Sequence, residues 1–157
     1  LGTMGNLYGF GWGVQQDLKV AHNYWQRAAA KHLATAMYNL GTLYLVGKPG
    51  FEKNDSKAFE WMKLAAEHRH IQAMLNLSSL YAMGRGTKQD LESALAWASL
   101  ALSNAKDPSL KAAANGQFQE LAKMVPRDRF ADIQAQMDGL AKTIDVNVKA
   151  YRTQSSP

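Results

Sequence analysis

The sequence predicts an all-helical protein in which pairs of helices repeat along the chain. Alanine is abundant and strand-favouring residues are sparse, so helix is favoured throughout. Residues 36–70 contain two stretches with small and apolar residues at i, i+3, i+4 and i+7, the spacing of one buried helix face. Similar pairs flank this region with a period of 36 to 37 residues, which is typical of a solenoid.

The second helix of each predicted pair gives the clearest register. Alanine recurs at equivalent positions, and an aromatic residue follows three residues later: Ala21 and Tyr24, Ala58 and Trp61, Ala94 and Trp97. We expect the alanines to allow close helix approach and the aromatic residues to fill the gaps between helix pairs.

The turn inside each predicted pair is rich in glycine. Residues 11–17 (GWGVQQD) match residues 84–90 (GRGTKQD), and the middle copy, 47–54, carries one extra residue. Glycine permits the positive φ that such turns need. Asp17 and Asp90 stand just before the second helices, so we expect them to cap the free N–H groups there.

The first helix of the pair is read from residues 40–44 (LGTLY), which recur as 77–81 (LSSLY). At the start of the chain we match residues 1–4 (LGTM) to this motif and interpret residues 5–7 as an insertion before Tyr8. Residues 1 to 33 are then an incomplete repeat. We expect the inserted segment to fold over its edge, or a second chain to cover that edge in a homodimer. The natural protein is also expected to extend upstream of Leu1.

Past residue 104 the repeat pattern ends. A helix is expected from about Pro108, a residue suited to a first helical turn, to Met124. Val125-Pro126 interrupts it, and another helix is expected over 127–142. We divide the chain into a repeat array (1–104), capping helices (105–143) and a frayed tail (144–157). Within the polar tail, short contacts are expected from Val146, Val148 and Tyr151.

Composition excludes several classes of function. Because the chain has no cysteine, it holds no disulfide, no cysteine-ligated zinc and no cysteine nucleophile. The formal net charge is +5, but the Lys and Arg residues are scattered, so we expect no nucleic-acid partner. No apolar run approaches the roughly 20 residues that span a bilayer, so membrane insertion is not expected. The sequence shows no signal peptide. Both alternatives stay open: that the natural protein has none, and that one has been removed.

The repeated motif resembles a known family. The pattern A-x-x-N-L-G-x-x-Y-x-x-G-x-G-V-x-x-D-x-x-x-A-x-x-W-x-x-x-A-A is similar to Sel1-like repeats, relatives of tetratricopeptide repeats, with Ser78 replacing the usual glycine and Ala98 the usual aromatic residue. The resemblance implies a right-handed α-solenoid of helix-turn-helix repeats, closed by a C-terminal capping helix pair. Family habit favours a bacterial periplasmic or exported location over the cytoplasm, and it also allows eukaryotic signalling adaptors.

No group of residues predicts catalysis or metal binding. His68 and His70 diverge on a helix because they are two residues apart, and we expect them at a solvated helix end. The carboxylates show no converging pair, and no serine has a matching base and acid. The Gly-x-Gly turns follow helices rather than strands, so they lack the context of a dinucleotide site. We therefore expect no enzyme activity, no metal and no cofactor.

The resemblance implies that the first helix of each repeat lines a concave groove. Carried over to this sequence, the groove-facing positions are Thr35, Tyr38, Asn39 and Thr42 in one repeat and Gln72, Leu75, Asn76 and Ser79 in the next. Asparagine amides at one repeated register suit pairing with the backbone of an extended peptide. Alternatively, Asn39 and Asn76 bond across the interface between repeats.

We therefore expect a non-enzymatic protein–protein interaction scaffold or adaptor that holds a protein or peptide segment in its groove. The alternative is a cell-envelope protein that binds carbohydrate or peptidoglycan, or accompanies a hydrolase, with Trp12 or an outward-facing Trp25 stacked on sugar rings. The sequence does not identify the partner.

Overall fold

The computed structural model describes residues 1–155, and these residues form helices joined by short turns. The elements are α1 (Gly2–Phe10), α2 (Leu18–Ala29), α3 (Ala34–Val46), α4 (Asp55–Glu67), α5 (Ile71–Met83), α6 (Leu91–Asn104), α7 (Pro108–Met124), the 3-10 helix η1 (Arg127–Arg129) and α8 (Phe130–Ser155). No strand occurs in this part of the chain, which confirms the all-helical class. None of these helices is long and apolar enough to cross a membrane.

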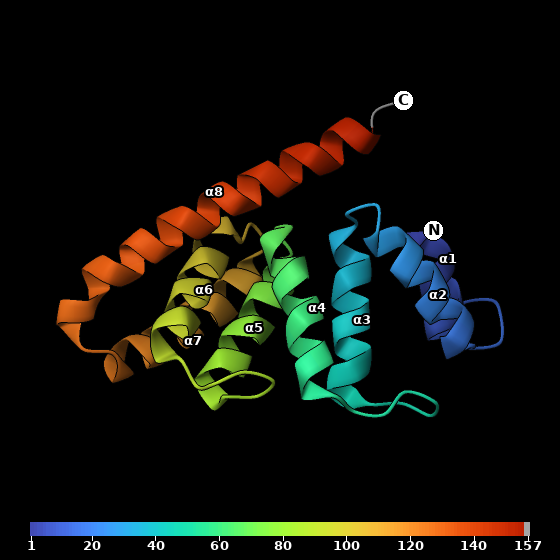
Figure 1. Ribbon diagram of the computed structural model, residues 1–157, viewed down its shortest axis with the longest axis horizontal. Helices are drawn as coiled ribbons and strands as arrows, with labels where there is room; N and C mark the ends of the chain where they lie inside the picture. The colour runs from blue at the N-terminus through green and yellow to red at the C-terminus, as the bar shows by residue number, and fades with distance from the viewer. Residues whose placement is uncertain (156–157) are drawn as a thin grey trace.

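The first six helices form three pairs that stack side by side in chain order (Figure 1). α1 packs on α2, α3 on α4 and α5 on α6, while α2 contacts α3 and α4 contacts α5. Each pair thus buries its apolar faces against its neighbours, as the repeat period predicts. The predicted α-solenoid is confirmed.

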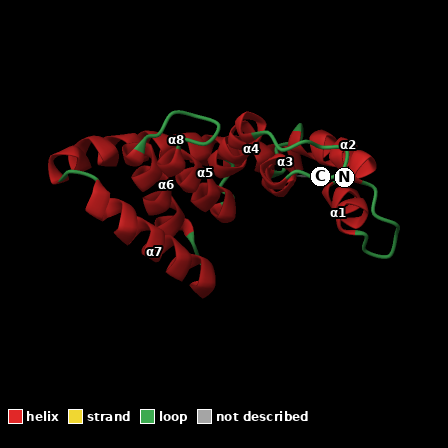
Figure 2. Ribbon diagram, turned by 90° about the horizontal axis from the view of Figure 1, so that it is seen from below, coloured by secondary structure: helices red, strands yellow, loops and turns green. Residues whose placement is uncertain are grey.

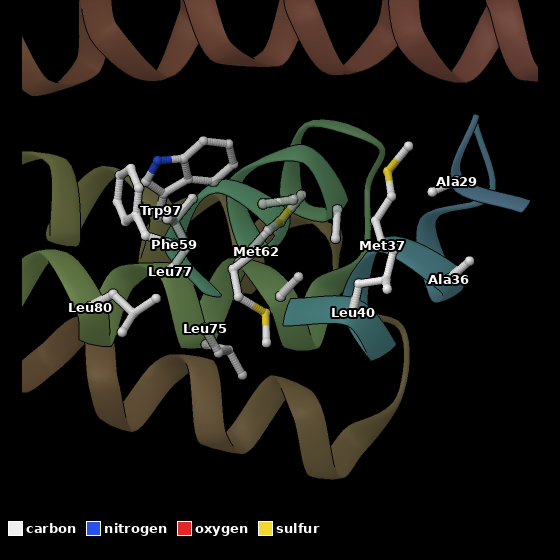
Figure 3. Packing of buried hydrophobic residues seen from close by; sticks show 14 of the residues in the cluster. Ala29, Ala36, Met37, Leu40, Phe59, Met62, Leu75, Leu77, Leu80 and Trp97 are labelled. Atoms are coloured by element: carbon white, nitrogen blue, oxygen red, sulfur yellow. The ribbon is translucent and has the colours of Figure 1, made fainter. Parts of the chain in front are cut away.

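The core of the array lies between successive pairs and is built largely from alanine, leucine and methionine. Leu40 of α3, Met62 of α4 and Leu77 of α5 belong to one buried cluster, and all three are fully buried (Figure 3). Trp97 of α6 is 2% exposed and fills a large gap, as expected for an aromatic residue at this register. Trp61 at the equivalent position is only partly buried.

The predicted caps at Asp17 and Asp90 are present, and Asn54 caps the second helix of the middle repeat in the same way. The side chain of Asp17 accepts from the backbone N–H groups of Lys19 and Val20, each at 3.0 Å. Asn54 accepts from the N–H of Lys57 at 2.9 Å, and Asp90 accepts from the N–H of Ser93 at 3.0 Å. Each bond satisfies an N–H that the helix itself leaves free.

A recurring backbone bond fixes the register of the repeats. The capping residue of each second helix donates its N–H to a tyrosine carbonyl on the first helix: Asp17 to Tyr8 (3.0 Å), Asn54 to Tyr44 (2.9 Å) and Asp90 to Tyr81 (2.9 Å). The tyrosine therefore marks the same structural position in each repeat. The middle repeat has one more residue between the two bonded groups, as the sequence shows.

This register corrects our interpretation of the start of the chain. α1 is one uninterrupted helix, so residues 5–7 are not an insertion and do not fold over an edge. Gly5 lies directly against the Trp25 ring, just as Gly41 lies against Met62. We had matched the Leu-Gly pair of the motif to residues 1–2. The packing requires the glycine of the motif to lie opposite Trp25, and that glycine is Gly5. The proposed homodimer at this edge stays a prediction.

The extra residue in the middle turn also has a physical explanation. Lys48 and Phe51 exchange backbone hydrogen bonds of 2.9 and 2.8 Å across Pro49 and Gly50. Gly50 has φ +83°, a conformation that side chains disfavour. The longer turn brings the Phe51 ring against His22 of α2, with ring centroids 4.9 Å apart.

The C-terminal helices close the array and then return along it. α7 has the predicted bounds, and it packs on α6 and α5. After the break at Val125-Pro126, α8 crosses back over the array toward the N-terminal repeat (Figures 1 and 2). Asp145 of α8 pairs with Arg69 in the α4–α5 turn, and Asn147 donates to the Glu67 carbonyl at 3.1 Å.

The predicted frayed tail is wrong for residues 144–155, which continue α8. The reason is burial: Ile144 is 2% exposed and Val148 packs on the core. Contacts were expected from three residues of this segment. Val148 packs on the core and Tyr151 is partly buried, whereas Val146 is 65% exposed and is not part of the core. The remaining residues of the predicted tail, 156–157, lie outside the described residues.

Candidate binding groove on the first helices

Three of the predicted groove residues, Tyr38, Asn39 and Thr42, line one pocket of about 370 Å³. Successive turns of α3 place them on one face, opposite α1. Thr35 is exposed but lies at the start of α3, outside this pocket. The structure thus brings together three of the four positions predicted in this repeat.

The rest of the pocket lining comes from α1, α2, the C-terminal part of α3 and two turns. These additional lining residues are Gly9, Phe10, Gln16, Leu18, Trp25, Leu43, Val46 and Lys48. Phe10 is 51% and Val46 59% exposed, so two apolar side chains form an open rim. Gln16 is held at the rim because its side-chain amide donates to the Gly9 carbonyl at 2.7 Å.

Tyr38 is fixed in place by a histidine from the next repeat. Its ring stacks on His70 with centroids 4.3 Å apart and planes inclined by 13°. His70 is the N-cap of α5, and its Nδ1 accepts from the Ala73 N–H at 3.2 Å. Burial lowers the pKa of His70 to about 4. The expectation of a solvated helix end is therefore wrong for His70.

Asn39 forms the bond across the repeat interface that we considered as its alternative role. Its amide donates to the Asn6 side-chain oxygen of α1 at 2.8 Å. The same oxygen accepts the indole N–H of Trp25 at 3.0 Å, which links three helices through one acceptor. Thr42 donates to the Tyr38 carbonyl at 3.0 Å within α3. Trp25 is 3% exposed, so it does not face outward to stack on a sugar ring.

In the next repeat, the capping helix α7 covers part of the predicted face. Leu75 is 4% exposed, and Gln117 of α7 donates to its carbonyl at 3.2 Å and to the Ser79 hydroxyl at 3.0 Å. Asn76 faces the preceding pair, where its amide lies 3.9 Å from the Met62 sulfur, and it accepts from Gln72 at 3.3 Å. The four positions predicted in this repeat therefore do not line the pocket between α1 and α3.

An exposed apolar residue that was not predicted from the sequence ends the first helix of every repeat. Phe10, Val46 and Met83 are the last residues of α1, α3 and α5, and they are 51%, 59% and 57% exposed. Applying the repeat period to exposed positions, rather than to core positions alone, would have found them. We call these three residues, which recur at one position of each repeat, the apolar row. Phe10 and Val46 also line the pocket, whereas Met83 lies outside it.

The histidines do not form a metal site in the described structure. Within residues 1–155 no group of three or more His, Asp or Glu side chains converges to hold a metal ion. His32 and His68 lie close, with Nδ1 of His32 3.2 Å from Nε2 of His68. His22 lies 3.1 Å from the Tyr44 hydroxyl, and burial followed by the charge of Lys57 lowers its pKa.

Comparison with known proteins identifies the repeat. The Sel1 repeat family model matches residues 1–32, 34–70 and 71–105. The chitin synthase regulator SKT5 of Saccharomyces cerevisiae is 35% identical over 92 residues, 58% of this chain and 13% of that protein. Cytochrome c oxidase assembly factor 7A of Xenopus laevis is 31% identical over 78 residues, 50% of this chain and 34% of that protein.

Two solved structures share the fold. The first is c5321, a protective antigen of uropathogenic Escherichia coli with an SLR fold. It superposes with a TM-score of 0.77 at 24% identity, over 99% of this chain and 32% of that one. A Sel1 repeat protein from Oxalobacter formigenes gives a TM-score of 0.63 at 33% identity, over 66% of this chain and 41% of that one.

Proposed function

Since the chain belongs to the Sel1 repeat family, with repeats matched across residues 1–105, we propose that it is a non-enzymatic protein-interaction scaffold. Its partner is a peptide segment that lies along the first helices and places an apolar side chain in the pocket between α1 and α3. The observation that carries this proposal is the recurrent apolar row formed by Phe10, Val46 and Met83.

The energetic argument rests on the exposure of that row. Each of these side chains leaves apolar surface in water, and covering it contributes about 25 cal/mol per Å² removed from solvent. A single exposed apolar residue needs no explanation, whereas a position that is apolar and half exposed in all three repeats suits a shared contact. Partner recognition typically combines such apolar anchors with a polar rim.

The polar groups beside the pocket suit an extended peptide. The rim presents the Tyr38 ring, the Gln16 amide and the Lys48 ammonium group. Tyr38 is immobilised by His70, so little side-chain entropy is lost when it contacts a partner. The Asn39 amide already donates to Asn6, so we assign Asn39 mainly to shaping the pocket.

The named roles of the relatives agree with this class of function. One is called a regulator of chitin synthase and the other an assembly factor for cytochrome c oxidase. The chain spans only 13% and 34% of these two proteins, so neither partner is transferred to it. They support a role in contacting another protein, exerted here by the repeat array.

A displayed peptide library selected on the purified chain tests this proposal. We expect enriched peptides with a shared apolar anchor, and we expect Val46→Ser and Tyr38→Ala to weaken their binding about tenfold or more by fluorescence anisotropy. Leu64→Ser is the matched control, because Leu64 is 39% exposed on α4, away from the pocket. Selected peptides that bind the two groove variants and the control equally would exclude the groove.

A carbohydrate-binding role rests on one observation. Trp12 is 61% exposed and lies beside Phe10, with ring centroids 5.1 Å apart, an arrangement that offers an aromatic surface to a sugar. A peptidoglycan pull-down separates the two functions. Retention that is lost in Trp12→Ala and kept in Val46→Ser supports the carbohydrate role, and no retention leaves the peptide groove as the proposed site.

A further inference from the structure

A second pocket lies at the other end of α3, where α8 crosses the turns that join successive helix pairs. It has a volume of about 350 Å³. Five basic or imidazole side chains line it: His32, His68, Arg69, Lys106 and Arg152. They come from three inter-pair turns and from α8, so only the folded array brings them together. This basic pocket is separate from the groove pocket.

The charge of the basic pocket favours an anion. Arg69 and Lys106 are positively charged near neutral pH. The nearby carboxylate of Asp145 pairs with Arg69, and it does not line the pocket. Two cations that line one cavity attract negative charge more strongly there than at an open surface, because the cavity walls exclude part of the solvent.

The histidine pair is poorly suited to bind a metal ion. Nδ1 of His68 lies 2.8 Å from the Leu64 carbonyl, which can only accept, so this nitrogen carries the proton. Nε2 of His68 is then the acceptor, and Nδ1 of His32 donates to it across 3.2 Å. The lone pair on Nε2 of His68 is therefore occupied by the hydrogen bond from His32 and cannot bind a metal ion. The positive charges nearby also repel a metal cation.

We propose that the basic pocket binds a phosphate group, either as inorganic phosphate or as the monoester of a small molecule. Arg69 and Lys106 supply charge-assisted hydrogen bonds to the phosphate oxygens. The pocket also contains Ala34 and Thr35 at the start of α3, whose N-cap, Leu33, has no side-chain acceptor. The backbone N–H groups of this first turn add further donors.

Titration of the whole chain with inorganic phosphate at low ionic strength, followed by amide NMR, tests the proposal. We expect saturable shifts confined to the turns around residues 32–35, 68–69 and 106, and none with chloride at equal ionic strength. Lys106→Gln is expected to weaken binding about tenfold, since one charge-assisted contact is lost. Lys111→Gln removes an exposed charge outside the pocket and should leave the affinity unchanged.

A second variant and a second ligand complete the test. Arg69→Asn introduces a residue type that tolerates the φ of +63° found there and removes a guanidinium group from the pocket, so it should also weaken phosphate binding. Tighter binding of phosphoserine than of phosphate would identify a monoester as the ligand, and equal binding would identify the free anion. Absence of saturable shifts, or equal losses in Lys106→Gln and Lys111→Gln, would overturn the site.

Discussion

Tyr38 and His70 stack across two consecutive repeats, with ring centroids 4.3 Å apart. The contact buries the imidazole at the N-terminus of α5, where its Nδ1 must stay unprotonated to accept the Ala73 N–H. A positive charge at a helix N-terminus also opposes the helix dipole. Burial holds the pKa of His70 at about 4, below the ordinary value of 6.5.

This relationship predicts that the folded state loses stability as the pH falls from about 6.5 to about 4. Above this window His70 is neutral in both states. Inside it the unfolded chain binds a proton that the folded chain excludes, so unfolding becomes more favourable. The difference in pKa corresponds to about 3 kcal/mol at most. Urea unfolding at pH 7 and pH 4.5 measures it.

The variant His70→Asn separates this effect from other titrations. Asparagine still caps α5 but does not titrate, so the pH dependence should become shallower. A residual slope is expected from His22, whose pKa is also lowered. Identical pH dependence in the variant and the wild type would contradict the role assigned to His70.

The asparagine acceptor between the first three helices predicts a loss of stability in Asn6→Ala. The substitution leaves the buried indole N–H of Trp25 and the amide of Asn39 without their common acceptor. Two lost bonds of this kind cost about 2 kcal/mol. Asn23→Ala is the control, because Asn23 is exposed on α2 and gains the same helix propensity. Equal unfolding midpoints for the two variants would show that the Asn6 bonds contribute nothing.

Local signals predicted much of this fold. Asp17 and Asp90 mark helix starts by accepting from backbone N–H groups within one turn, and Pro108 marks the start of α7 because its fixed φ suits the first helical position. Such local signals can be read from the sequence alone. The register of α1 needed a tertiary contact, because the Leu-Gly pair at residues 1–2 imitates the repeat motif locally. The bond from the Asp17 N–H to the Tyr8 carbonyl and the packing of Gly5 against Trp25 identify the equivalent position.

In the candidate site, too, local spacing predicted some features, and others depend on tertiary packing. Helical spacing brought Tyr38, Asn39 and Thr42 together as expected. It could not show that Gln117, 42 residues after Leu75, covers the corresponding face of α5. The stacking of His70 on Tyr38 likewise depends on how two repeats pack, which no spacing within one helix reports.

Packing of α8 predicts unequal effects for two neighbouring apolar residues. Ile144→Ala should cost about 3 kcal/mol, because the side chain is 2% exposed and its loss leaves a cavity against the array. Val146→Ala should change stability by less than about 0.5 kcal/mol, since Val146 is 65% exposed. Urea unfolding of both variants measures this contrast. Small and equal effects would mean that this part of α8 does not pack on the array.

Among the turn glycines, Gly86 in the last repeat should lose the most stability when it is replaced by alanine. Gly86 has φ +72°, and a β-carbon there would overlap the Asp55 carbonyl of α4 and lie 2.9 Å from the Phe59 β-carbon. Arg85 beside it binds the Asp55 carboxylate at 2.7 and 3.1 Å, so this turn is seated on the preceding repeat. Gly86→Ala therefore forces the two repeats apart as well as straining the turn.

Gly13→Ala separates the two costs. Gly13 has nearly the same φ, +73°, but nothing lies within 4 Å of the position of its β-carbon. This variant should lose about 1 kcal/mol from the backbone alone, and Gly86→Ala about 3 kcal/mol or more. Urea unfolding gives both values, and far-ultraviolet circular dichroism reports whether Gly86→Ala still folds. Equal losses at the two glycines would show that contact with α4 does not limit this turn.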